Sequence, residues 1–262
     1  MALLEAREVT VRFGGLVAAD GVSIAVDPGQ TVGLIGPNGA GKTTLLAAIS
    51  GQIVPHGGRV VFDGRDVTDW EPERRAQAGM GRTFQRLELF RKMTVFENLQ
   101  VAAEARFGEA AFIVDLTGRT RRGRQAESLA REVAARMGLE DVLDRLADQV
   151  STGLGRLVEI GRALCTEPKI LLLDEPAGGL DDAETDRLAE VLGELAAGGG
   201  PAVLLVEHDV DLVMELCDRI SVMDFGKVIA EGAPKQVKRD PAVRAAYLGT
   251  EEVAHAGAAG RP

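Results

Sequence analysis

A glycine-rich segment near the N-terminus combines the residue types that bind phosphate groups. The spacing G-x-x-x-x-G-K-[ST] is satisfied by Gly36, Pro37, Asn38, Gly39, Ala40, Gly41, Lys42 and Thr43. Glycines allow the backbone to curl so that successive N–H groups point at phosphate oxygens, and Lys42 supplies a positive charge for the β and γ phosphates. The Thr43 hydroxyl is suited to ligate Mg²⁺, and the helix that continues through Thr44 adds its positive dipole end. These residues predict a site for a nucleoside triphosphate and Mg²⁺.

Two acidic residues follow an apolar run in the second half of the chain. The run at residues 170–173 predicts a buried strand, and Asp174 and Glu175 come at its end, at the edge where doubly wound sheets bind ligands. Asp174 is suited to ligate Mg²⁺, and Glu175 is suited to polarise a water that attacks a phosphate as a catalytic base. The alternative, in which the two acids only cap the next helix, fits less well beside a phosphate-binding segment.

One histidine occupies a comparable position. His208 follows the apolar run at residues 202–206 and is therefore expected at the same edge of the sheet, whereas His56 lies in a turn and His255 in the tail. An imidazole can hydrogen-bond a γ-phosphate and an attacking water together, which predicts a catalytic role for His208. A surface histidine at the end of a strand is the alternative.

The elements that position these residues follow from the pattern of apolar residues. Short β-type runs come first, helical spacing extends over residues 94–164, and strands then alternate with helices expected at 182–195 and 209–216. Buried apolar strands that alternate with helices predict an α/β fold with a mostly parallel, doubly wound sheet. Gly51 is expected to end the helix that follows the phosphate-binding segment.

Several other side chains can be assigned to the interior or the surface. In the helix that follows residue 153, an apolar face is formed by Leu157, Ile160 and Leu164. Arg156 is expected outside that face, and the basic run at residues 119–124 is expected to be a solvated loop between helices. Cys165 and Cys217 form no CxxC pair, which predicts buried thiols in a reducing compartment.

Composition restricts the class of protein. The 262 residues are 45% hydrophobic and 27% charged, and the formal net charge of −10 disfavours a general nucleic-acid-binding surface. No apolar run approaches the ~20 residues that a membrane span needs. Acidic residues occupy the N-terminus, where a signal peptide would need an apolar region. We therefore expect a cytosolic protein that reaches a membrane only by docking to another subunit.

Taken together, the phosphate-binding segment, "LLLDEP", "GGLD" and "VEHD" resemble the ATP-binding subunit of ABC transporters over essentially the whole chain. The resemblance implies that Phe13 stacks on adenine, that Gln85 contacts Mg²⁺ and the γ-phosphate, and that Asp181 belongs to the ATP site. It also implies an α/β P-loop NTPase (RecA-like) core with an antiparallel β subdomain at residues 1–86 and 166–233. A helical signature subdomain is then inserted at 87–165, and a C-terminal helix and disordered tail occupy 234–262.

Longer stretches, "RTFQ", "MTVFENL" and "DPAVRAAYLG", resemble the ATPases of branched-chain amino acid importers. This resemblance implies transmembrane permease subunits as partners, a solute-binding protein as an indirect partner, and a peripheral position on the cytoplasmic face of the cell membrane. ATPases of lipid or lipopolysaccharide exporters are near enough in pattern to remain an alternative. A soluble ABC-type remodelling ATPase would show a second nucleotide domain, a coiled coil or basic extensions, and a P-loop kinase or GTPase would lack this series of motifs.

The turn with which ABC ATPases reach the nucleotide of an opposite subunit is altered here. The family pattern L-S-G-G-Q aligns with residues 150–154, where Ser151 and Gly153 remain while Thr152 and Leu154 replace a glycine and the glutamine. Ser151 can still donate its hydroxyl, and Gly153 still allows a phosphate to approach the helix N-terminus. A heterodimer with a second ATPase subunit is favoured, because the importers that the chain resembles use two ATPases. A homodimer is the alternative.

Overall fold

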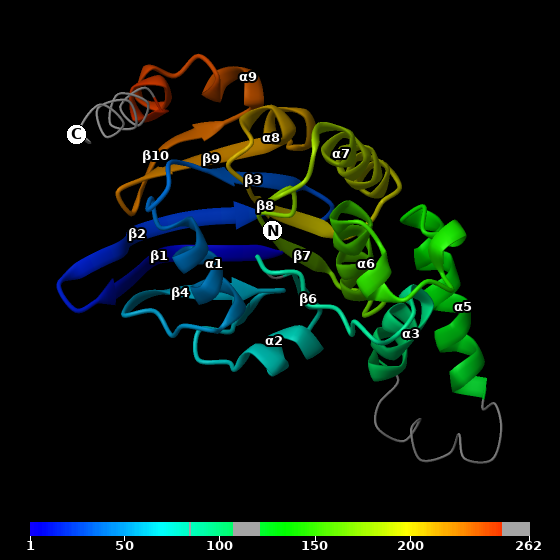
Figure 1. Ribbon diagram of the computed structural model, residues 1–262. Helices are drawn as coiled ribbons and strands as arrows, with labels where there is room; N and C mark the ends of the chain where they lie inside the picture. The colour runs from blue at the N-terminus through cyan, green and yellow to red at the C-terminus, as the bar shows by residue number, and fades with distance from the viewer. Residues whose placement is uncertain (84, 107–120, 248–262) are drawn as a thin grey trace, which may run out of the picture. The chain divides into compact units, whose positions relative to one another are not determined.

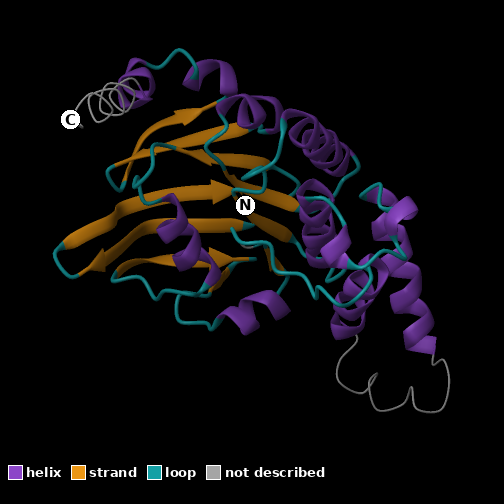
Figure 2. Ribbon diagram, viewed as in Figure 1, coloured by secondary structure: helices purple, strands orange, loops and turns teal. Residues whose placement is uncertain are grey.

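The computed structural model describes residues 1–83, 85–106 and 121–247, and Figure 1 shows its course. The chain forms two compact units, one made of Met1–Ala78 with Ala202–Pro262 and the other of Gly79–Pro201. Each unit combines helices with strands (Figure 2), which confirms the predicted α/β class. The bounds expected for the core, the helical subdomain and the C-terminal segment stay a prediction. The tail expected to be disordered includes residues 248–262, which lie outside the described residues.

An antiparallel sheet in the first unit contains the N-terminal strands. Its order is β2-β1-β4-β5, with bounds Leu16–Val26, Leu4–Phe13, Gly57–Phe62 and Arg65–Asp66. The register of β1 shifts around Glu8, whose φ is 52°, so that Leu4 and Ala6 before it and Val9 and Val11 after it are all buried. This sheet is the expected antiparallel part of the fold, and it leaves Phe13 at the hairpin, opposite Leu16.

The other strands of the first unit are mostly parallel. Strand β3 (Thr31–Ile35) pairs in parallel with β8 (Ala202–Val206) and with β9 (Arg219–Asp224), and β10 (Lys227–Gly232) pairs antiparallel with β9. Every residue of β3 and β8 is buried, so their apolar residues run without alternation. Because β3 and β8 are parallel, the residues that follow them emerge at the same edge.

Helix α1 (Lys42–Ser50) begins directly after the phosphate-binding segment. It ends at Gly51, whose φ of 86° confirms the predicted cap. Helix α2 (Pro72–Gln77) contributes the buried Arg75, whose Nη1 donates to two carbonyl oxygens in the last turn of α1, at 2.9 and 2.6 Å. These are carbonyls that a helix end leaves without intrahelical partners. Burial lowers the pKa of Arg75 to about 10, so the guanidinium stays charged at neutral pH.

The first unit also contains the short helices α8 (Val210–Leu216) and α9 (Pro234–Val237). Helix α8 confirms the helix expected at 209–216, and Asp209 is its N-cap. The Asp209 carboxylate accepts hydrogen bonds from the N–H groups of Asp211 (3.0 Å) and Leu212 (3.1 Å). The segment after β8 is therefore fixed at its far end by a helix cap.

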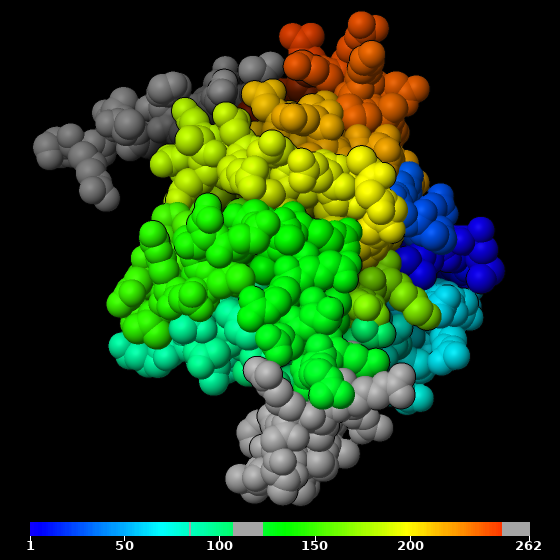
Figure 3. Space-filling model, turned by 90° about the vertical axis from the view of Figure 1, so that its right-hand side faces the viewer, coloured from blue at the N-terminus to red at the C-terminus, as the bar shows by residue number. Residues whose placement is uncertain are grey.

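The second unit joins a short parallel strand pair to a group of helices. Strand β6 (Met80–Arg82) pairs with β7 (Ile170–Asp174). The helices are α3 (Val95–Arg106), α5 (Arg121–Arg136), α6 (Thr152–Leu164) and α7 (Asp182–Ala197), with 3₁₀ turns at Glu140–Val142 and Ala147–Gln149. Helices α3, α5 and α6 pack on one another, and Figure 3 looks onto the green surface of this group. Across the described ranges of the chain, no helix combines the length and apolar character needed to cross a membrane.

Two surface assignments made from the sequence are wrong. Residues 121–124 of the basic run lie in the first turn of α5 rather than in a loop, while residues 119–120 lie outside the described residues. Arg156, expected outside the apolar face of α6, is only 6% exposed. It is buried because Glu159 pairs with Nη1 (3.1 Å) and the carbonyl oxygen of Gln85 accepts from Nη2 (2.6 Å). The apolar face predicted for α6 is buried as expected, at Leu157, Ile160 and Leu164.

Candidate functional site

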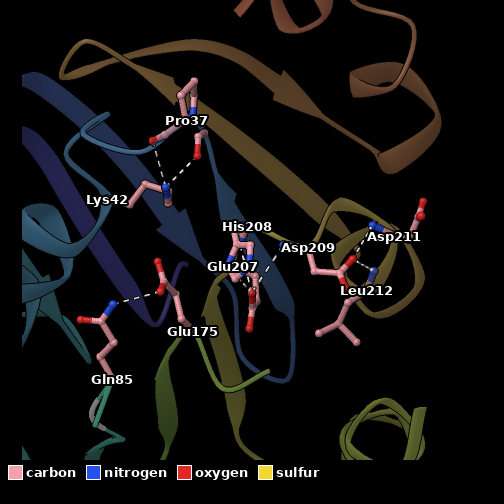
Figure 4. Close-up of polar contacts among 10 residues, drawn as sticks. Pro37, Lys42, Gln85, Glu175, Glu207, His208, Asp209, Asp211 and Leu212 are labelled. Carbon is pink, nitrogen blue, oxygen red and sulfur yellow. Dashed lines mark hydrogen bonds and ion pairs between the residues drawn. The ribbon is translucent and has the colours of Figure 1, made fainter. Parts of the chain in front are cut away.

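The phosphate-binding segment connects β3 to α1 in the first unit. Lys42, the first residue of α1, is 5% exposed, and its ammonium donates to the carbonyl oxygens of Gly36 (2.7 Å) and Pro37 (3.1 Å; Figure 4). These contacts hold the charged end of Lys42 within the curl of the loop. Thr43, the next residue, is exposed, so its hydroxyl is accessible at the start of the helix.

Glycine is required at both ends of this loop by the backbone. Gly36 and Gly41 have φ values of 151° and 99°, in the range that favours glycine. A Cβ on Gly41 would lie 2.0 Å from the carbonyl oxygen of Ala18, and one on Gly36 would lie 2.1 Å from that of Met223. The loop can therefore close against its neighbours only with glycine at these positions. A closely curled backbone before a helix fits the phosphate-binding role that the sequence predicts.

Phe13 lies at the end of β1, with 52% of its surface exposed. Its partner across the hairpin, Leu16, is 67% exposed. An aromatic residue that served only to fill the core would be buried, so this exposure favours the predicted stacking on a base.

A buried acid that the sequence analysis did not single out follows β8. Glu207 is fully buried, and its carboxylate accepts from the backbone N–H of His208 (3.0 Å; Figure 4). The same oxygen lies 3.4 Å from Nδ1 of His208, whose side chain is 59% exposed. Glu207 therefore contacts the imidazole from the buried side, and the rest of the ring is exposed to solvent. In the sequence, Glu207 is the acidic residue of "VEHD" and comes directly after a strand of five apolar residues.

In the second unit, the structure brings Gln85 and Glu175 together. The side-chain N–H₂ of Gln85 donates to Oε2 of Glu175 across 3.0 Å (Figure 4). Glu175 follows β7 directly and has a φ of 49°, a conformation that residues other than glycine adopt only where their surroundings compensate. This contact joins the predicted catalytic base to the residue that the family resemblance places against Mg²⁺ and the γ-phosphate.

Asp174, predicted to ligate Mg²⁺, has an arginine beside it. Its side chain is 2% exposed, and Oδ2 lies 3.3 Å from Nη2 of Arg82. The parallel register places Arg82, the last residue of β6, opposite Leu172 of β7. Burial lowers the pKa of Arg82, and the charge of Asp174 opposes that shift.

The altered turn at residues 150–154, called the signature turn below, leads into α6. Ser151 is the N-cap, and its hydroxyl oxygen accepts from the N–H of Leu154 (3.3 Å). The N–H of Gly153 donates to the carboxylate of Glu184 (3.0 Å). Asp181, predicted at the ATP site, is the N-cap of α7 and accepts from the N–H of Glu184 (2.8 Å). Glu184, which no sequence motif identified, therefore contacts both the turn and Asp181.

A second connection runs from α6 to the end of β7. Arg156 binds the carbonyl oxygen of Gln85, and the side chain of Gln85 binds Glu175. One chain of polar contacts thus extends from α6 to Glu175, the residue predicted to be the catalytic base. Sequence reasoning missed Arg156, because an arginine in an amphipathic helix is ordinarily exposed.

Comparisons with known proteins agree with these observations. Residues 19–178 match the ABC transporter family, and residues 227–253 match the family of branched-chain amino acid ATP-binding cassette transporters. BraF of Pseudomonas aeruginosa, a high-affinity branched-chain amino acid transport ATP-binding protein, is 41% identical over 251 residues, which cover 94% of this chain and 98% of BraF. LivG of Escherichia coli K12, which has the same description, is 40% identical over 249 residues (94% and 98%). The lipopolysaccharide export ATP-binding protein LptB of Haemophilus influenzae is 35% identical over 251 residues (96% and 99%).

Solved structures extend the similarity to the fold. An ATP-binding cassette of an ABC transporter in its ADP conformation has a TM-score of 0.81 at 35% identity, with 95% of this chain and 99% of that chain covered. A dimeric cassette in a post-hydrolysis state, bound to ADP and phosphate, has a TM-score of 0.72 at 26% identity, with coverage of 88% and 98%.

The fold and the phosphate-binding loop define an ATP-binding α/β protein of the P-loop class. The chain belongs to the ABC transporter family and is the ATP-binding and ATP-hydrolysing subunit of such a transporter. Within that family it is similar to the cassettes of the branched-chain amino acid branch.

Proposed function

We propose that this subunit powers the uptake of branched-chain amino acids, or of a related small polar or amphipathic solute, from the cytoplasmic face of a membrane. The observation that carries the proposal is the match of residues 227–253 to the branched-chain amino acid cassette family. The whole-length similarity to BraF and LivG supports it. Transmembrane permease subunits would carry the solute, and a solute-binding protein would deliver it to them.

ATP binding is assigned to the residues of the phosphate loop and to Phe13. Lys42 offers a cation within a curled loop at the N-terminus of α1, which suits the β and γ phosphates. The exposed face of Phe13 suits adenine. Oxygen ligands suited to Mg²⁺ are present on Thr43, Asp174 and Gln85. The metal, when bound, supplies positive charge that neutralises the phosphates during hydrolysis.

Hydrolysis is assigned to Glu175 as the general base that accepts a proton from the attacking water. The neutral amide of Gln85 orients this carboxylate without adding charge beside it. His208, held by Glu207, would hydrogen-bond the γ-phosphate and the water. Such a reaction depends on positioning and on electrostatic stabilisation, which are what these contacts provide.

ATP is further proposed to pair two ATPase subunits. Ser151 and Gly153 of one subunit would bind the γ-phosphate held by the other, and the dimeric cassette among the structural neighbours supports this arrangement. A different ATPase is favoured as the partner, with a homodimer as the alternative. Binding by both subunits closes the dimer, and hydrolysis removes the bridging charge and reopens it.

Export of a lipid or lipopolysaccharide is the second candidate, because LptB is 35% identical over nearly the whole chain. The C-terminal match favours the importer over this alternative.

Uptake of radiolabelled leucine by cells tests the proposal. Cells that lack the gene for this chain receive either the wild-type chain or the Glu175→Gln variant, made to equal amounts. We expect the wild-type chain to restore leucine uptake and the variant to leave it at background. Normal leucine uptake in the deletion strain would exclude leucine as the solute and leave only the related solutes. Loss of lipopolysaccharide from the cell surface of that strain would favour the exporter.

A further inference from the structure

Glu184 is the third residue of α7, and its side chain accepts a hydrogen bond at the start of α6. Its backbone N–H donates to Asp181, the N-cap of α7, across 2.8 Å. A glutamate at this position usually reaches back to the backbone N–H of its own N-cap. Here Oε1 of Glu184 instead accepts the N–H of Gly153, at 3.0 Å, in the first turn of α6.

The N–H of Gly153 is one of the donors that a helix N-terminus leaves without an intrahelical partner. Gly153 is buried although its neighbours Ser151 and Thr152 are exposed, because the carboxylate covers it. A Cβ at this position would lie 2.7 Å from the carboxyl carbon of Glu184. The N–H of Leu154 is also engaged, by the Ser151 hydroxyl at 3.3 Å. The N–H groups of Gly153 and Leu154 therefore both bind oxygens of this chain.

We propose that the Glu184 carboxylate occupies the place of a γ-phosphate oxygen and must leave Gly153 before the signature turn can bind the phosphate of a facing nucleotide. Two anions that require the same N–H cannot both lie about 3 Å from it without strong repulsion. Glu184 is thus a positioning residue, which acts through Gly153 and sets the ATP concentration at which two subunits close. The inference rests on the proposed function, in which this turn binds a γ-phosphate.

The test uses the full chain carrying Glu175→Gln, with ATP titrated at fixed Mg²⁺ and association followed by light scattering, alone and with a second ATPase subunit. Glu184→Gln keeps the shape of the side chain and removes its charge. We expect the ATP concentration at half-maximal association to fall roughly fivefold, the difference between a hydrogen bond to a charged acceptor and one to a neutral acceptor. Glu194→Gln, an exposed glutamate on the same helix, removes the same charge and is expected to change nothing.

A second readout separates this role from a structural one. In the chain with Glu175 intact, Glu184→Gln is expected to lower the KM for ATP and to leave kcat unchanged. A residue that merely supported the turn would, when changed, raise the KM or lower kcat.

The outcomes distinguish the inference from the proposed function. If the Glu175→Gln parent associates and Glu184→Gln needs as much ATP or more, the role given to Glu184 is wrong, because the carboxylate then supports the turn. If the parent associates neither alone nor with a second ATPase, the proposed pairing is wrong, and the role of Glu184 falls with it.

Discussion

The side-chain amide of Gln85 donates to the carboxylate of Glu175 across 3.0 Å, and the carbonyl oxygen of the same residue accepts from Arg156 across 2.6 Å. A neutral amide suits this place because it orients an ionised acid without repelling it. The backbone contact with Arg156 limits how far the amide can move. The position of the proposed base therefore depends on a residue in the helix that the signature turn begins.

Replacing Gln85 tests this dependence. Gln85→Glu would replace the hydrogen bond to Glu175 with a second carboxylate, so the two acids would repel each other or share a proton and the base would lose its position. We expect ATP turnover at neutral pH to fall on the order of 100-fold, the scale of lost general base catalysis. Gln85→Ala removes the orienting contact without adding charge and should have a smaller effect. Turnover by Gln85→Glu at the wild-type rate would show that the contact has no part in hydrolysis.

Arg156 should also matter for stability. Arg156→Met removes the guanidinium that pairs with the buried carboxylate of Glu159, which is 6% exposed. We expect the free energy of unfolding in urea to fall by about 3 kcal/mol. Adding Glu159→Gln should recover much of that loss. Arg187→Met breaks an exposed pair with Glu190 and is the control, expected to cost about 0.5 kcal/mol or less. Equal losses at the two arginines would contradict the buried pairing.

Two glycines of the phosphate loop provide a matched pair of substitutions. Gly41→Ala combines a φ of 99° with a Cβ placed 2.0 Å from the carbonyl oxygen of Ala18. Gly39→Ala meets only the strain of a φ of 82°, because no atom of the described residues lies within 4 Å of its Cβ position. We expect Gly39→Ala to cost about 1 kcal/mol of stability and Gly41→Ala about 3 kcal/mol. Binding of a fluorescent ATP analogue should be lost only in Gly41→Ala, and retention there would show that the loop closes differently.

The two buried cysteines predict how the free energy of unfolding depends on pH. Cys165 and Cys217 are buried, as expected from the sequence, and burial raises the pKa of each thiol from 9.0 to about 12, with Asp218 adding to the shift at Cys217. Their contribution to stability is complete below pH 9, because both thiols are then protonated in the folded and unfolded chains. It is lost as the pH rises toward 12, since the unfolded chain releases these protons first.

A thiol reagent such as iodoacetamide at pH 8 should therefore label neither cysteine in the folded chain and both in denaturant. Labelling of the folded chain at the rate of a free thiol would contradict the burial of the two residues.

Features that depend on neighbouring residues in the sequence could be predicted. The phosphate loop, the end of α1 at Gly51 and the acids that follow β7 are fixed by local backbone requirements and by apolar runs. The buried face of α6 followed from its helical period. Patterns among neighbouring residues thus predicted the strands and helices on which the residues of the proposed site lie.

Contacts between distant segments could not be predicted. Arg156 was expected at the surface because only Glu159, three residues on, is visible in the local pattern, whereas its other partner is the backbone of Gln85. The contact of Glu184 with Gly153 likewise joins residues 31 positions apart. Polar residues enter the interior where a partner is supplied by the fold, and a single sequence does not show that partner.

ATP held by the phosphate loop is proposed to pair this chain with a second ATPase subunit. Light scattering on the Glu175→Gln chain, with and without ATP and Mg²⁺, alone and mixed with that second subunit, tests it most directly. We expect ATP to double the mass of the particle and Lys42→Ala in the same chain to abolish the change. A chain that binds ATP and remains a monomer in both arrangements would contradict it.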